Sequence, residues 1–534
     1  MRSLTKASAL ALIAVLAAGP ARTQTAPESI DAVFSRWSEQ TPGCAVGVER
    51  AGSAPVTRAY GLAELEHGAP ATPATIYEAG SVSKQFTAAA ILLLEQDGRL
   101  SLDDDVRTHV PELPDYGTPI TIRHLLTHTS GLRDWGSVAA VEGWPRGSRA
   151  MTNDRAVEIM VRQRGLNYAP GAEWLYSNSG YNLAAVIVQR VSGESLAAFT
   201  ARRLFQPLGM RDTRWRDDFT AVVPGRATAY VRRADGYHEA MPFEDAYGNG
   251  GLLTTVGDLL IWNRALDSRA LGAELTETLH RRGRAGGRET HYALGLQYDR
   301  HHGEAEIAHG GSTGGYRAWL GRYPERGLSI ALLCNTAEAN AERLGRTVAD
   351  LFLPPAREVE PYVPTTTPPE GLFVSTRTGE PFGLRLGPAG LTTMQGQPLT
   401  PVGPDRWSLG PNTLVFTSAD SFDRLTPDGD VIPHVRAEPA RPDAEALAAL
   451  TGVYVSDEVP ARIAVAVEDG RLVLRRGVDP AAPLAPAQAD VFVGPAGVIR
   501  FERDGSGAVV AFHLNNGRVR DLTFRRASSQ GSRP

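Results

Sequence analysis

The chain has 534 residues, too many for one compact core, so two or three domains are expected. Hydrophobic residues make up 42% and charged residues 22% of it, proportions typical of globular proteins rather than disordered ones. The formal net charge is −5, and no basic stripe with interleaved aromatic residues occurs, which argues against a nucleic-acid partner.

The first residues have the pattern of an export signal. Arg2 and Lys6 precede an apolar run at residues 9–18, and small residues follow as far as Ala21. We therefore predict that residues 1–25 are a signal peptide of a periplasmic or secreted protein, with an uncleaved anchor as the alternative. No later run reaches the ~18 apolar residues that a membrane helix needs, so no membrane span is expected in the mature chain.

Strands and helices are both expected in residues 26–355. The predicted strands, of which the first two turn at Gly52, lie at residues 44–48, 56–61, 292–298, 305–308, 316–323 and 328–334. The predicted helices are a buried one that ends near Gly98 and others at residues 122–127, 153–163, 181–191, 252–267 and 337–353. Asn178 is expected between two of them, and residues 132–148 as an irregular loop. Because strands come first and last, both ends of this region should meet in one antiparallel sheet, which is an α+β fold.

The chain contains two cysteines, Cys44 and Cys334, and each lies in an apolar run that predicts a strand. Two buried free thiols are expected. A disulfide is the alternative, which an exported location would allow. Neither thiol has a set of histidines nearby, so we predict no metal and no other cofactor.

The character of the sequence changes after a Pro- and Thr-rich linker at residues 356–368. Helical periodicity ends, and short alternating runs are separated by Gly, Pro and Asp turns. Residues 371–375 recur as residues 452–456, with a further echo of residues 383–386 at residues 470–474. The repeat predicts two antiparallel β-barrel units at residues 369–440 and 441–529, with a helical connector at residues 441–450.

The first motif that carries chemistry is Ser81-x-x-Lys84, at the start of the buried helix. On a helix these positions are neighbours, so the Lys84 amine would lie beside the Ser81 hydroxyl, where the helix N-terminus favours an oxyanion. Lys6 and Lys84 are the only lysines, and an arginine cannot take a proton from a serine whereas a desolvated lysine can. Although the spacing also arises by chance, it indicates a nucleophile with a lysine base.

The second motif is Tyr176-Ser-Asn178, which follows Pro170 and Gly171. A phenol needs help to act as a base at neutral pH, and a nearby lysine ammonium would stabilise its phenolate. The amide of Asn178 both donates and accepts, so it can orient Lys84 and a substrate amide together. The alternative is a core aromatic residue followed by a helix cap.

The third motif begins at His309, where four glycines occur within seven residues next to predicted strands. Such a run is typical of a sheet edge that a ligand approaches closely. The backbone N–H of Ser312, together with that of Ser81, would form an oxyanion hole. The alternative is a glycine-rich hairpin with an incidental histidine, and a phosphate loop is disfavoured because no helix and lysine follow the glycines.

Together the three motifs resemble those of the serine β-lactamase and penicillin-binding-protein family, in its class C-like branch. That branch has Ser-x-x-Lys, Tyr-x-Asn and Lys/His-x-Gly in this order, and the flanks at residues 80–87, 124–132 and 176–181 are similar too. The resemblance covers about residues 30–353. It implies a β-lactamase-like α/β domain, with an antiparallel sheet flanked by helices and a helical subdomain.

The resemblance also implies roles for the motif residues. Ser81 would be acylated, while Lys84 and Tyr176 would share its proton and later activate water. Substrate binding and orientation would fall to Asn178, His309 and Gly311. The oxyanion would be held by the backbone N–H groups of Ser81 and Ser312.

His309 departs from the lysine that β-lactamases commonly have at this place and that helps to hold a substrate carboxylate. A mostly neutral imidazole does this less well, which disfavours penicillin hydrolysis and carboxypeptidase action. Histidine here and the loop at residues 130–135 are similar to D-aminopeptidases and esterases with C-terminal lipocalin-like barrels, in which a loop of the last barrel narrows the site. An acidic group for a substrate amine would then be expected, and the candidates are Asp134, Glu142, Glu244 and Asp245.

We therefore expect an exported serine hydrolase that cleaves amide or ester bonds through an acyl-enzyme on Ser81. An aminopeptidase or amidase for D-amino-acid peptides is the first hypothesis. The alternatives are an esterase of the same fold, a β-lactamase or D,D-carboxypeptidase, and, from another class, a non-catalytic ligand-binding protein. The expected partner is a small peptide, amide or ester substrate.

Overall fold

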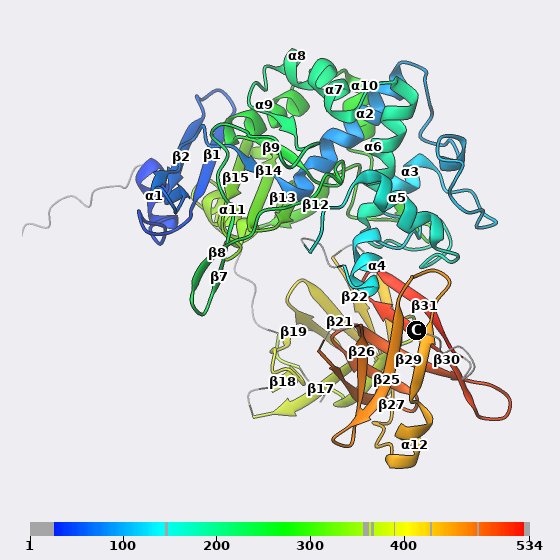
Figure 1. Cartoon of the computed structure of the whole chain (residues 1–534). Coiled ribbons are helices and arrows are strands. Elements are labelled where there is room, and N and C mark those ends of the chain that lie inside the picture. The colour runs from blue at the N-terminus through cyan, green and yellow to red at the C-terminus, as the bar shows by residue number, and fades with distance from the viewer. Residues whose placement is uncertain are drawn as a thin grey trace, which may run out of the picture.

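The structure is a computed structural model that describes residues 26–144, 148–355, 362–364, 368–388, 390–427, 430–477 and 480–527. The predicted signal peptide and most of the predicted linker lie outside these residues. A mixed helix and strand domain comes first, and two β-rich units follow it, drawn in yellow and in orange to red (Figure 1).

The first domain is built on a six-stranded antiparallel sheet with strand order β12-β13-β14-β15-β1-β2. Its strands are β1 (Cys44–Arg50), β2 (Val56–Tyr60), β12 (Gln297–His301), β13 (Glu304–Thr313), β14 (Tyr316–Tyr323) and β15 (Leu328–Cys334). The first strand, β1, pairs along its whole length with the last, β15. The expectation that both ends of this region meet in one sheet is therefore confirmed.

Helices cover both faces of this sheet (Figure 1). The helices of the domain are α1 (Ala26–Val33), α2 (Lys84–Gln96), α3 (Ile122–Leu126), α4 (Trp135–Glu142), α5 (Asn153–Arg162), α6 (Asn178–Ser192), α7 (Leu196–Thr200), α8 (Gln206–Leu208), α9 (Val256–Asp267), α10 (Ala273–Leu279) and α11 (Ala341–Asp350). Alternate residues of β1 serve the two faces, because Val46 packs in one core with α1 and α11 while Ala45 packs in the other with α2 and α9. Gly47 lets α9 lie close, since a Cβ there would be 2.9 Å from the side chain of Leu260.

Shorter strands connect these elements. They are β3 (Leu62–Glu64), β4 (Ala69–Pro70), β5 (Tyr77–Glu78), β6 (Arg214–Trp215), β7 (Tyr230–Arg233), β8 (Gly236–Glu239), β9 (Leu252–Thr254), β10 (Arg284–Ala285) and β11 (Arg288–Glu289). A small sheet of β5, β9 and β6 lies directly before the turn that carries Ser81, and thus fixes where the buried helix α2 begins.

Three predictions of local structure were wrong. The segment predicted as an irregular loop contains helix α4, whose first turn is capped by Asp134 accepting from Ser137 N and which ends at Gly143 with φ of 104°. The helix predicted to begin at residue 252 begins at Val256, because Thr255 is its N-cap and the three residues before it form β9. The strand predicted from residue 292 begins at Gln297, after a turn in which Gly295 has φ of 82°.

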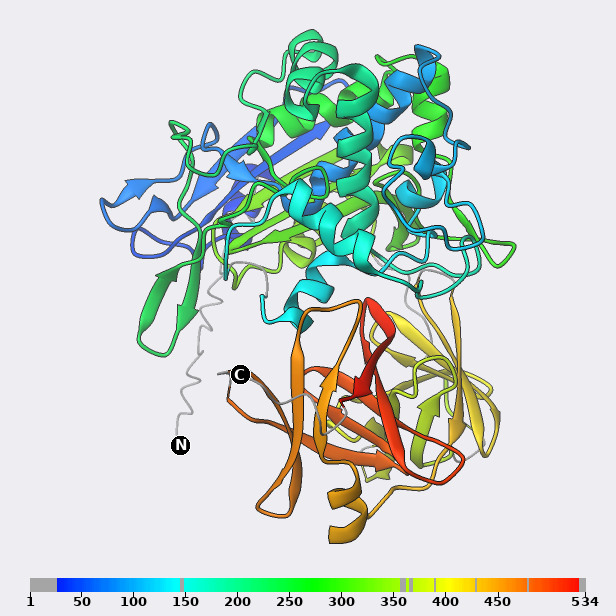
Figure 2. The same ribbon diagram turned by 45° about the vertical axis from the view of Figure 1, so that its right-hand side comes forward.

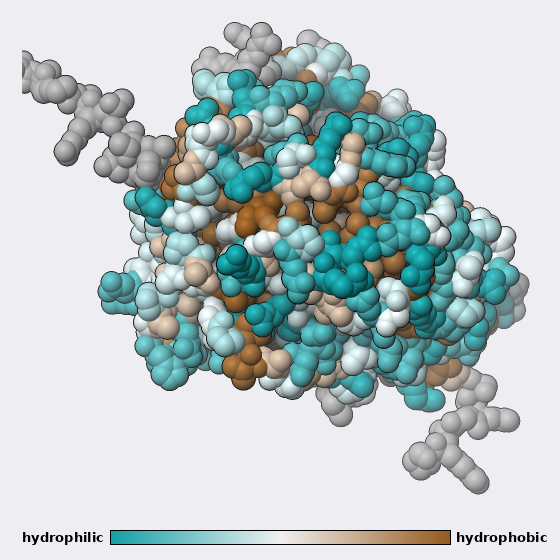
Figure 3. Space-filling model, turned by 90° about the horizontal axis from the view of Figure 1, so that it is seen from above, coloured by the Kyte–Doolittle hydropathy of each residue, from teal (hydrophilic) through white to brown (hydrophobic). Residues whose placement is uncertain are grey.

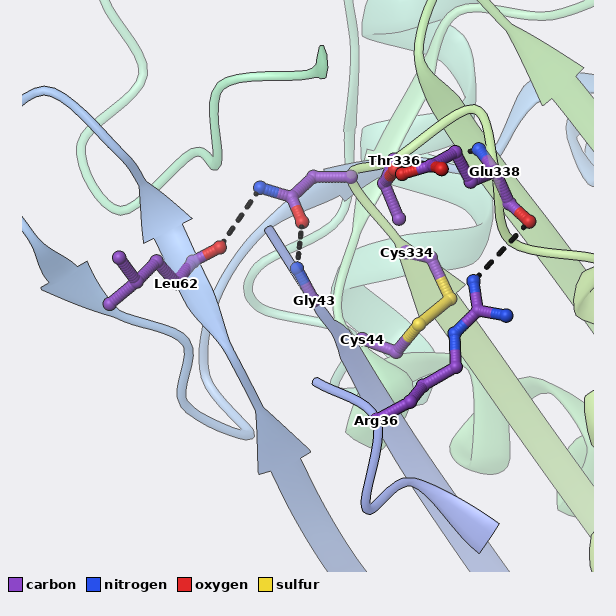
Figure 4. The surroundings of a disulfide bond; sticks show 8 residues. Arg36, Gly43, Cys44, Leu62, Cys334, Thr336 and Glu338 are labelled. Carbon is purple, nitrogen blue, oxygen red and sulfur yellow. Dashed lines mark hydrogen bonds between the residues drawn. A yellow bond between two sulfur atoms is a disulfide. The ribbon is translucent and has the colours of Figure 1, made fainter. Parts of the chain in front are cut away.

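The expectation of two free thiols was also wrong, because Cys44 and Cys334 form a disulfide. They are direct partners in the register of β1 and β15, so the bond joins the first and last strands of the sheet (Figure 4). Asn335 holds the same region together, since it accepts from Gly43 N at 2.8 Å and donates to the carbonyl of Leu62 at 3.1 Å. The minority alternative, a disulfide, is the correct one.

Both β-rich units have eight antiparallel strands. The strands of the first, nearly closed unit are β16 (Gly371–Ser375), β17 (Pro381–Gly387), β18 (Gly390–Thr393), β19 (Thr400–Gly403), β20 (Arg406–Leu409), β21 (Asn412–Ser418), β22 (Ser421–Leu425) and β23 (Val431–Arg436). Helix α12 (Ala444–Ala449) is the connector. The second unit is a closed barrel of β24 (Gly452–Val455), β25 (Arg462–Glu468), β26 (Arg471–Arg476), β27 (Ala482–Gln488), β28 (Val491–Gly494), β29 (Gly497–Arg503), β30 (Val509–Asn516) and β31 (Val519–Arg526).

The first pair of repeated segments forms equivalent strands in the two units. Residues 371–375 and 452–455 form the opening strands of the two units, β16 and β24. The second echo does not correspond, because residues 383–386 lie in the second strand of their unit and residues 471–474 in the third strand of theirs. The expectation of two antiparallel barrel-like units is nevertheless confirmed.

The closed barrel docks on the first domain through buried polar contacts. Arg133 Nη1 lies 2.6 Å from Glu458 of the barrel, and the Arg133 side chain is only 3% exposed. The same carboxylate accepts from Arg164 N at 2.6 Å. Both ribbon views show the red end of the barrel directly beneath α4 (Figures 1 and 2). The barrel is therefore held against the side of the domain that carries residues 133–176.

Hydrophilic residues cover most of the surface seen from above, and hydrophobic residues gather in patches toward the middle of that face (Figure 3). Within the described ranges, no helix is both long and apolar enough to cross a membrane.

Candidate active site

Ser81 lies in a 3-10 turn, η1 (Gly80–Ser83), directly before α2. Two glycines let strand β13 lie against this turn. A Cβ at Gly80, whose φ is 52°, would be 2.6 Å from Ser312 N, and a Cβ at Gly311 would be 2.0 Å from the carbonyl of Ala79. Because of this close approach, the backbone N–H of Ser312 lies beside the turn that holds Ser81.

The Nζ of Lys84 lies 3.1 Å from the Oγ of Ser81. The same nitrogen donates to Asn178 Oδ1 at 3.0 Å and to the backbone carbonyl of Asn249 at 2.6 Å. Lys84 is fully buried, so little water is present to stabilise a charged amine. A neutral amine in this position uses its two hydrogens for these oxygens and keeps a lone pair for the serine hydroxyl.

The aromatic ring of Tyr176 lies 4.9 Å from the Nζ of Lys84. His128 holds the segment around this tyrosine, because its carbonyl accepts from Leu175 N at 3.0 Å and its Nδ1 accepts from Ser177 N at 3.3 Å. Burial, and then the charge of Lys84, keep the pKa of His128 well below its usual value, so the ring is neutral and Nδ1 remains an acceptor. Its imidazole packs on Tyr176 with ring centroids 4.2 Å apart.

Asn178 is the first residue of α6 rather than a residue between two helices. Its backbone N donates to Asp134 Oδ2 at 2.7 Å while its side chain accepts from Lys84. Asp134 also accepts from Ser137 N at 2.9 Å. This carboxylate therefore joins the N-termini of α4 and α6 and fixes the position of Asn178.

None of the four acidic candidates for a substrate amine lines the hollow described below, and Asp134 holds the two helix N-termini instead. Glu142 pairs with Arg155 and Arg162, Glu244 lies 3.9 Å from Arg216, and Asp245 accepts from Phe219 N at 2.7 Å. The acidic residues that do line the hollow described below are Glu338 and Glu342. No motif in the sequence indicated either of them.

His309 is buried and locked into one neutral form. Its Nδ1 lies 2.6 Å from the carbonyl of Gly310, which only accepts, so Nδ1 carries the hydrogen. The Nε2 atom then accepts from the hydroxyl of Tyr292 at 2.9 Å. Burial, and then the charge of Lys84, lower the pKa of His309 to about 3. The imidazole therefore provides no positive charge for a substrate carboxylate at neutral pH.

The predicted site residues line a hollow of about 740 Å³, which we call the active-site hollow. It is bounded by Ser81, Trp174, Tyr176, Asn178, Gln297, His309, Gly310, Gly311, Ser312, Arg317, Ala318, Ala337, Glu338, Ala339, Asn340, Ala341, Glu342 and Arg518. The structure thus brings the three motifs together around one space. Lys84 is not part of this lining, and it contacts the lining through Ser81.

Arg518 comes from the turn between β30 and β31 of the closed barrel. Its guanidinium carbon lies 4.7 Å from the ring centroid of Tyr176. The backbone around it is pinned to the first domain, since Asp134 N and Asn167 Nδ2 donate to the carbonyl of Arg518 at 3.3 and 3.0 Å. Sequence reasoning missed this residue, because Asn516-Gly517 indicates a hairpin turn but not the place where the turn docks.

Among the described residues, one group of side chains has the spacing of a metal site, formed by His301, His302 and Asp350. It lies where the β12–β13 turn meets the end of α11, and none of its members lines the active-site hollow. The chemistry of the hollow therefore does not draw on it.

Comparison with known proteins agrees with this geometry. The profile of the family described as Beta-lactamase matches residues 22–353, more than half of the chain. A D-aminopeptidase of Gluconobacter oxydans is 28% identical over 355 residues, which are 65% of each chain. A D-aminopeptidase of Brucella ovis is 27% identical over 455 residues, covering 81% of this chain and 82% of that one. Penicillin-binding protein 4* of Bacillus subtilis is 40% identical over 158 residues, 29% of this chain and 34% of its own.

Solved structures support the fold. The D-amino acid amidase of Ochrobactrum anthropi has a TM-score of 0.53 at 24% identity, covering 61% of this chain and 98% of its own. The octameric penicillin-binding protein homologue of Pyrococcus abyssi has a TM-score of 0.56 at 22% identity, covering 85% and 98%. At these identities the likeness concerns the fold alone.

Proposed function

The chain belongs to the beta-lactamase family and is a serine hydrolase, and from this premise we propose that it cleaves amide or ester bonds through an acyl-enzyme on Ser81. The observation that carries the proposal is the 3.1 Å contact between Lys84 Nζ and Ser81 Oγ at the floor of the active-site hollow. The same amine lies against the ring of Tyr176 and donates to the side chain of Asn178, so the groups that orient this buried base are in contact with it.

Acylation begins when Ser81 Oγ attacks the substrate carbonyl carbon and its proton passes to the Lys84 amine. The carbonyl oxygen becomes an oxyanion, which accepts from the backbone N–H groups of Ser81 and Ser312. Each such donor contributes about 3 kcal/mol to the transition state. The bond from carbon to the leaving nitrogen or oxygen then breaks, and the leaving atom takes a proton from the Lys84–Tyr176 pair.

Deacylation reverses these roles. The pair, which returned to its starting protonation state when the leaving group departed, takes a proton from a water molecule that attacks the ester carbonyl of acylated Ser81. The second tetrahedral intermediate uses the same two N–H groups. When it collapses, Ser81 Oγ leaves and recovers the proton, so the enzyme returns to its starting state and the acid product is released.

The proposed substrates are peptides or amides of D-amino acids. Support comes from the relatives named D-aminopeptidase, of which the Brucella ovis protein aligns over 81% of the chain. The neutral His309 removes the cation that would hold a substrate carboxylate at the third motif. Glu338, which accepts from the Tyr237 hydroxyl, and Glu342, which pairs with Arg346, place two carboxylates in the lining of the hollow, and a carboxylate suits a substrate amine.

We also propose that the protein is exported to the periplasm or beyond, with residues 1–25 removed. The apolar run after Arg2 and Lys6 supports this. So does the disulfide between Cys44 and Cys334, since such bonds persist in oxidising compartments. Sequencing the N-terminus of the protein from a periplasmic fraction tests it, and a chain that begins at Met1 there would contradict the cleavage.

Two assays test the activity. A fluorophosphonate should label wild-type protein on Ser81 and should not label the S81A variant. The rates on D-alanine p-nitroanilide, p-nitrophenyl acetate and nitrocefin then rank the hydrolase classes, and we expect the D-alanyl substrate to give the highest kcat/KM. Absence of label on Ser81 would favour the ligand-binding alternative, and preference for the acetate would favour the esterase.

A further inference from the structure

The guanidinium of Arg518 stands at the wall of the active-site hollow with its hydrogen-bonding capacity unused. It offers five N–H donors, and among the described residues none of them has a hydrogen-bond acceptor. The side chain is 43% exposed. It thus presents a cation to the space above Ser81.

Asp134 is the nearest carboxylate, and it does not neutralise this cation in a close pair. The separation between Arg518 Nη1 and Asp134 Oδ2 is 3.9 Å, beyond hydrogen-bond distance. Both oxygens of Asp134 already accept backbone N–H groups, from Ser137 and from Asn178. A carboxylate in the hollow would therefore meet N–H groups of Arg518 that no closer acceptor occupies.

The lining holds two other side chains that carry or could carry positive charge, Arg317 and His309. Arg317 donates to the carbonyls of Gly314 and Tyr316 at 2.9 and 2.7 Å. His309 is neutral and bonded on both nitrogens. Of the two arginines of the lining, Arg518 is the one beside the ring of Tyr176.

The position of Arg518 puts it on the leaving-group side of the scissile bond. In the proposed mechanism the leaving nitrogen takes its proton from the Lys84–Tyr176 pair, so the leaving group lies next to the phenol. Arg518 lies 4.7 Å from that ring. In a leaving amino acid the carboxyl carbon is only two bonds from the nitrogen, so such a carboxylate is within reach of the guanidinium.

We propose that Arg518 forms a subsite for a carboxylate on the leaving group, so that the enzyme prefers peptides whose released amino acid has a free α-carboxylate. A planar guanidinium binds a carboxylate through two parallel hydrogen bonds, which gives orientation as well as affinity. The inference rests on the proposed function. It adds a residue of the closed barrel, Arg518, to the groups that determine which substrates the catalytic domain accepts.

The docking of the barrel makes this subsite rigid. The carbonyl of Arg518 accepts from Asp134 N and Asn167 Nδ2, and Arg520 N donates to Asn167 Oδ1 at 2.7 Å. The backbone at Arg518 and just after it is therefore fixed before a substrate arrives. A preorganised group loses less entropy on binding, so more of its interaction energy is available for selectivity.

A matched pair of substrates tests the proposal: D-alanyl-glycine and its C-terminal amide, which differ only in the carboxylate. In wild-type protein we expect kcat/KM to be at least tenfold higher for the acid. This acid-to-amide ratio of kcat/KM should fall at least tenfold in R518Q. It should fall less in R518K, which keeps the positive charge but lacks the two parallel N–H groups of the guanidinium. The R475Q variant is the control, because Arg475 lies on the same barrel and pairs with Glu468 outside the hollow. Equal losses on both substrates in R518Q would overturn the proposal, since Arg518 would then act through Tyr176.

A second readout requires no turnover. N-acetylglycine should slow the labelling of Ser81 by a fluorophosphonate more than N-acetylglycinamide does, and this difference should disappear in R518Q. If neither dipeptide is cleaved but the difference in protection remains, the D-aminopeptidase proposal fails while the subsite stands. If the two compounds protect wild-type protein equally, the subsite is wrong.

Discussion

The Nζ of Lys84 lies 3.1 Å from the Oγ of Ser81 while it donates to two further oxygens, those of Asn178 and Asn249. The contact arises because the two residues are three apart where the 3-10 turn passes into α2. Close packing then excludes water from the amine. The arrangement resembles a base held in one orientation before the substrate binds.

This relationship predicts the effect of replacing Lys84 by arginine. K84R has no group that takes a proton at neutral pH, so labelling of Ser81 by a fluorophosphonate should slow at least 10³-fold. Because Lys84 is fully buried, K84M serves as a variant of similar length that adds no bulk. Thermal melting shows whether each variant is folded. Folded K84R with more than a tenth of the wild-type labelling rate would refute the role of Lys84.

We predict that removing the disulfide lowers the free energy of unfolding but leaves the catalytic activity unchanged. It closes a loop across a sequence separation of 290 and lies in the core on the α1 and α11 side of the sheet. The C44A/C334A variant should lose about 2–4 kcal/mol in its free energy of unfolding. Its kcat/KM should stay within twofold of wild type. Urea unfolding measures the first quantity, and an unchanged midpoint would contradict the prediction.

Five histidines, three of them buried and two half-buried, predict a steep loss of stability in mild acid. Burial lowers the pKa of four of them to about 3 or 4 and holds that of the fifth well below its usual value; they are His309, His280, His291, His434 and His128. The unfolded chain takes up these protons below pH ~6.5, whereas the folded chain does not until about pH 4. Because the folded state disfavours the protonated imidazoles, the free energy of unfolding falls as the pH falls through this window. The decrease is about 1.4 kcal/mol per pH unit for each histidine.

Variants separate the histidines from the carboxylates, which titrate over part of the same range. H434Q removes one buried imidazole of the first β-rich unit, so the melting temperature should fall less between pH 6.5 and 5 than in wild type. H67Q is the control, since the His67 side chain is 79% exposed. Identical pH slopes in H434Q and wild type would show that His434 is accessible to protons in the folded protein.

The buried pair between Arg133 and Glu458 predicts how the closed barrel is held. E458Q leaves the Arg133 guanidinium buried without its counter-charge, and breaking such a pair typically costs about 3–5 kcal/mol. The barrel should then undock more often, and limited proteolysis between the domains should become faster. E502Q is the matched control, because Glu502 pairs with His513 on the outside of the same barrel. Equal proteolysis rates in the two variants would contradict this account of the docking.

Residues whose spacing is local were predictable from the sequence. Ser81 and Lys84 are neighbours because one helical turn separates them. The glycines near His309 were interpreted as a sheet edge that a ligand approaches, and one of them, Gly311, lies against the backbone of Ala79. Alternating and continuous apolar runs located most strands of the six-stranded sheet. These features depend on chain geometry over a few residues, which a single sequence contains.

The residues that docking brings together were not predictable, although the family resemblance implied that a loop of the last barrel narrows the site. Arg518 contacts Tyr176 although it lies near the other end of the chain, and no local sequence pattern specifies which surface a hairpin turn packs against. The partner of Cys44 depends on the register of two strands 290 residues apart. The helix α4 was missed because its glycine and tryptophan are weak helix formers, whereas tertiary contacts and the cap at Asp134 decide its conformation.

The most direct test of the account is intact-protein mass spectrometry of a reaction with a D-alanyl ester, quenched in acid during turnover. We predict a D-alanyl adduct that peptide mapping places on Ser81, absent in S81A, with turnover of S81A reduced at least 10³-fold. Undiminished turnover in S81A, or an adduct on another residue, would contradict the claim that Ser81 carries the acyl group.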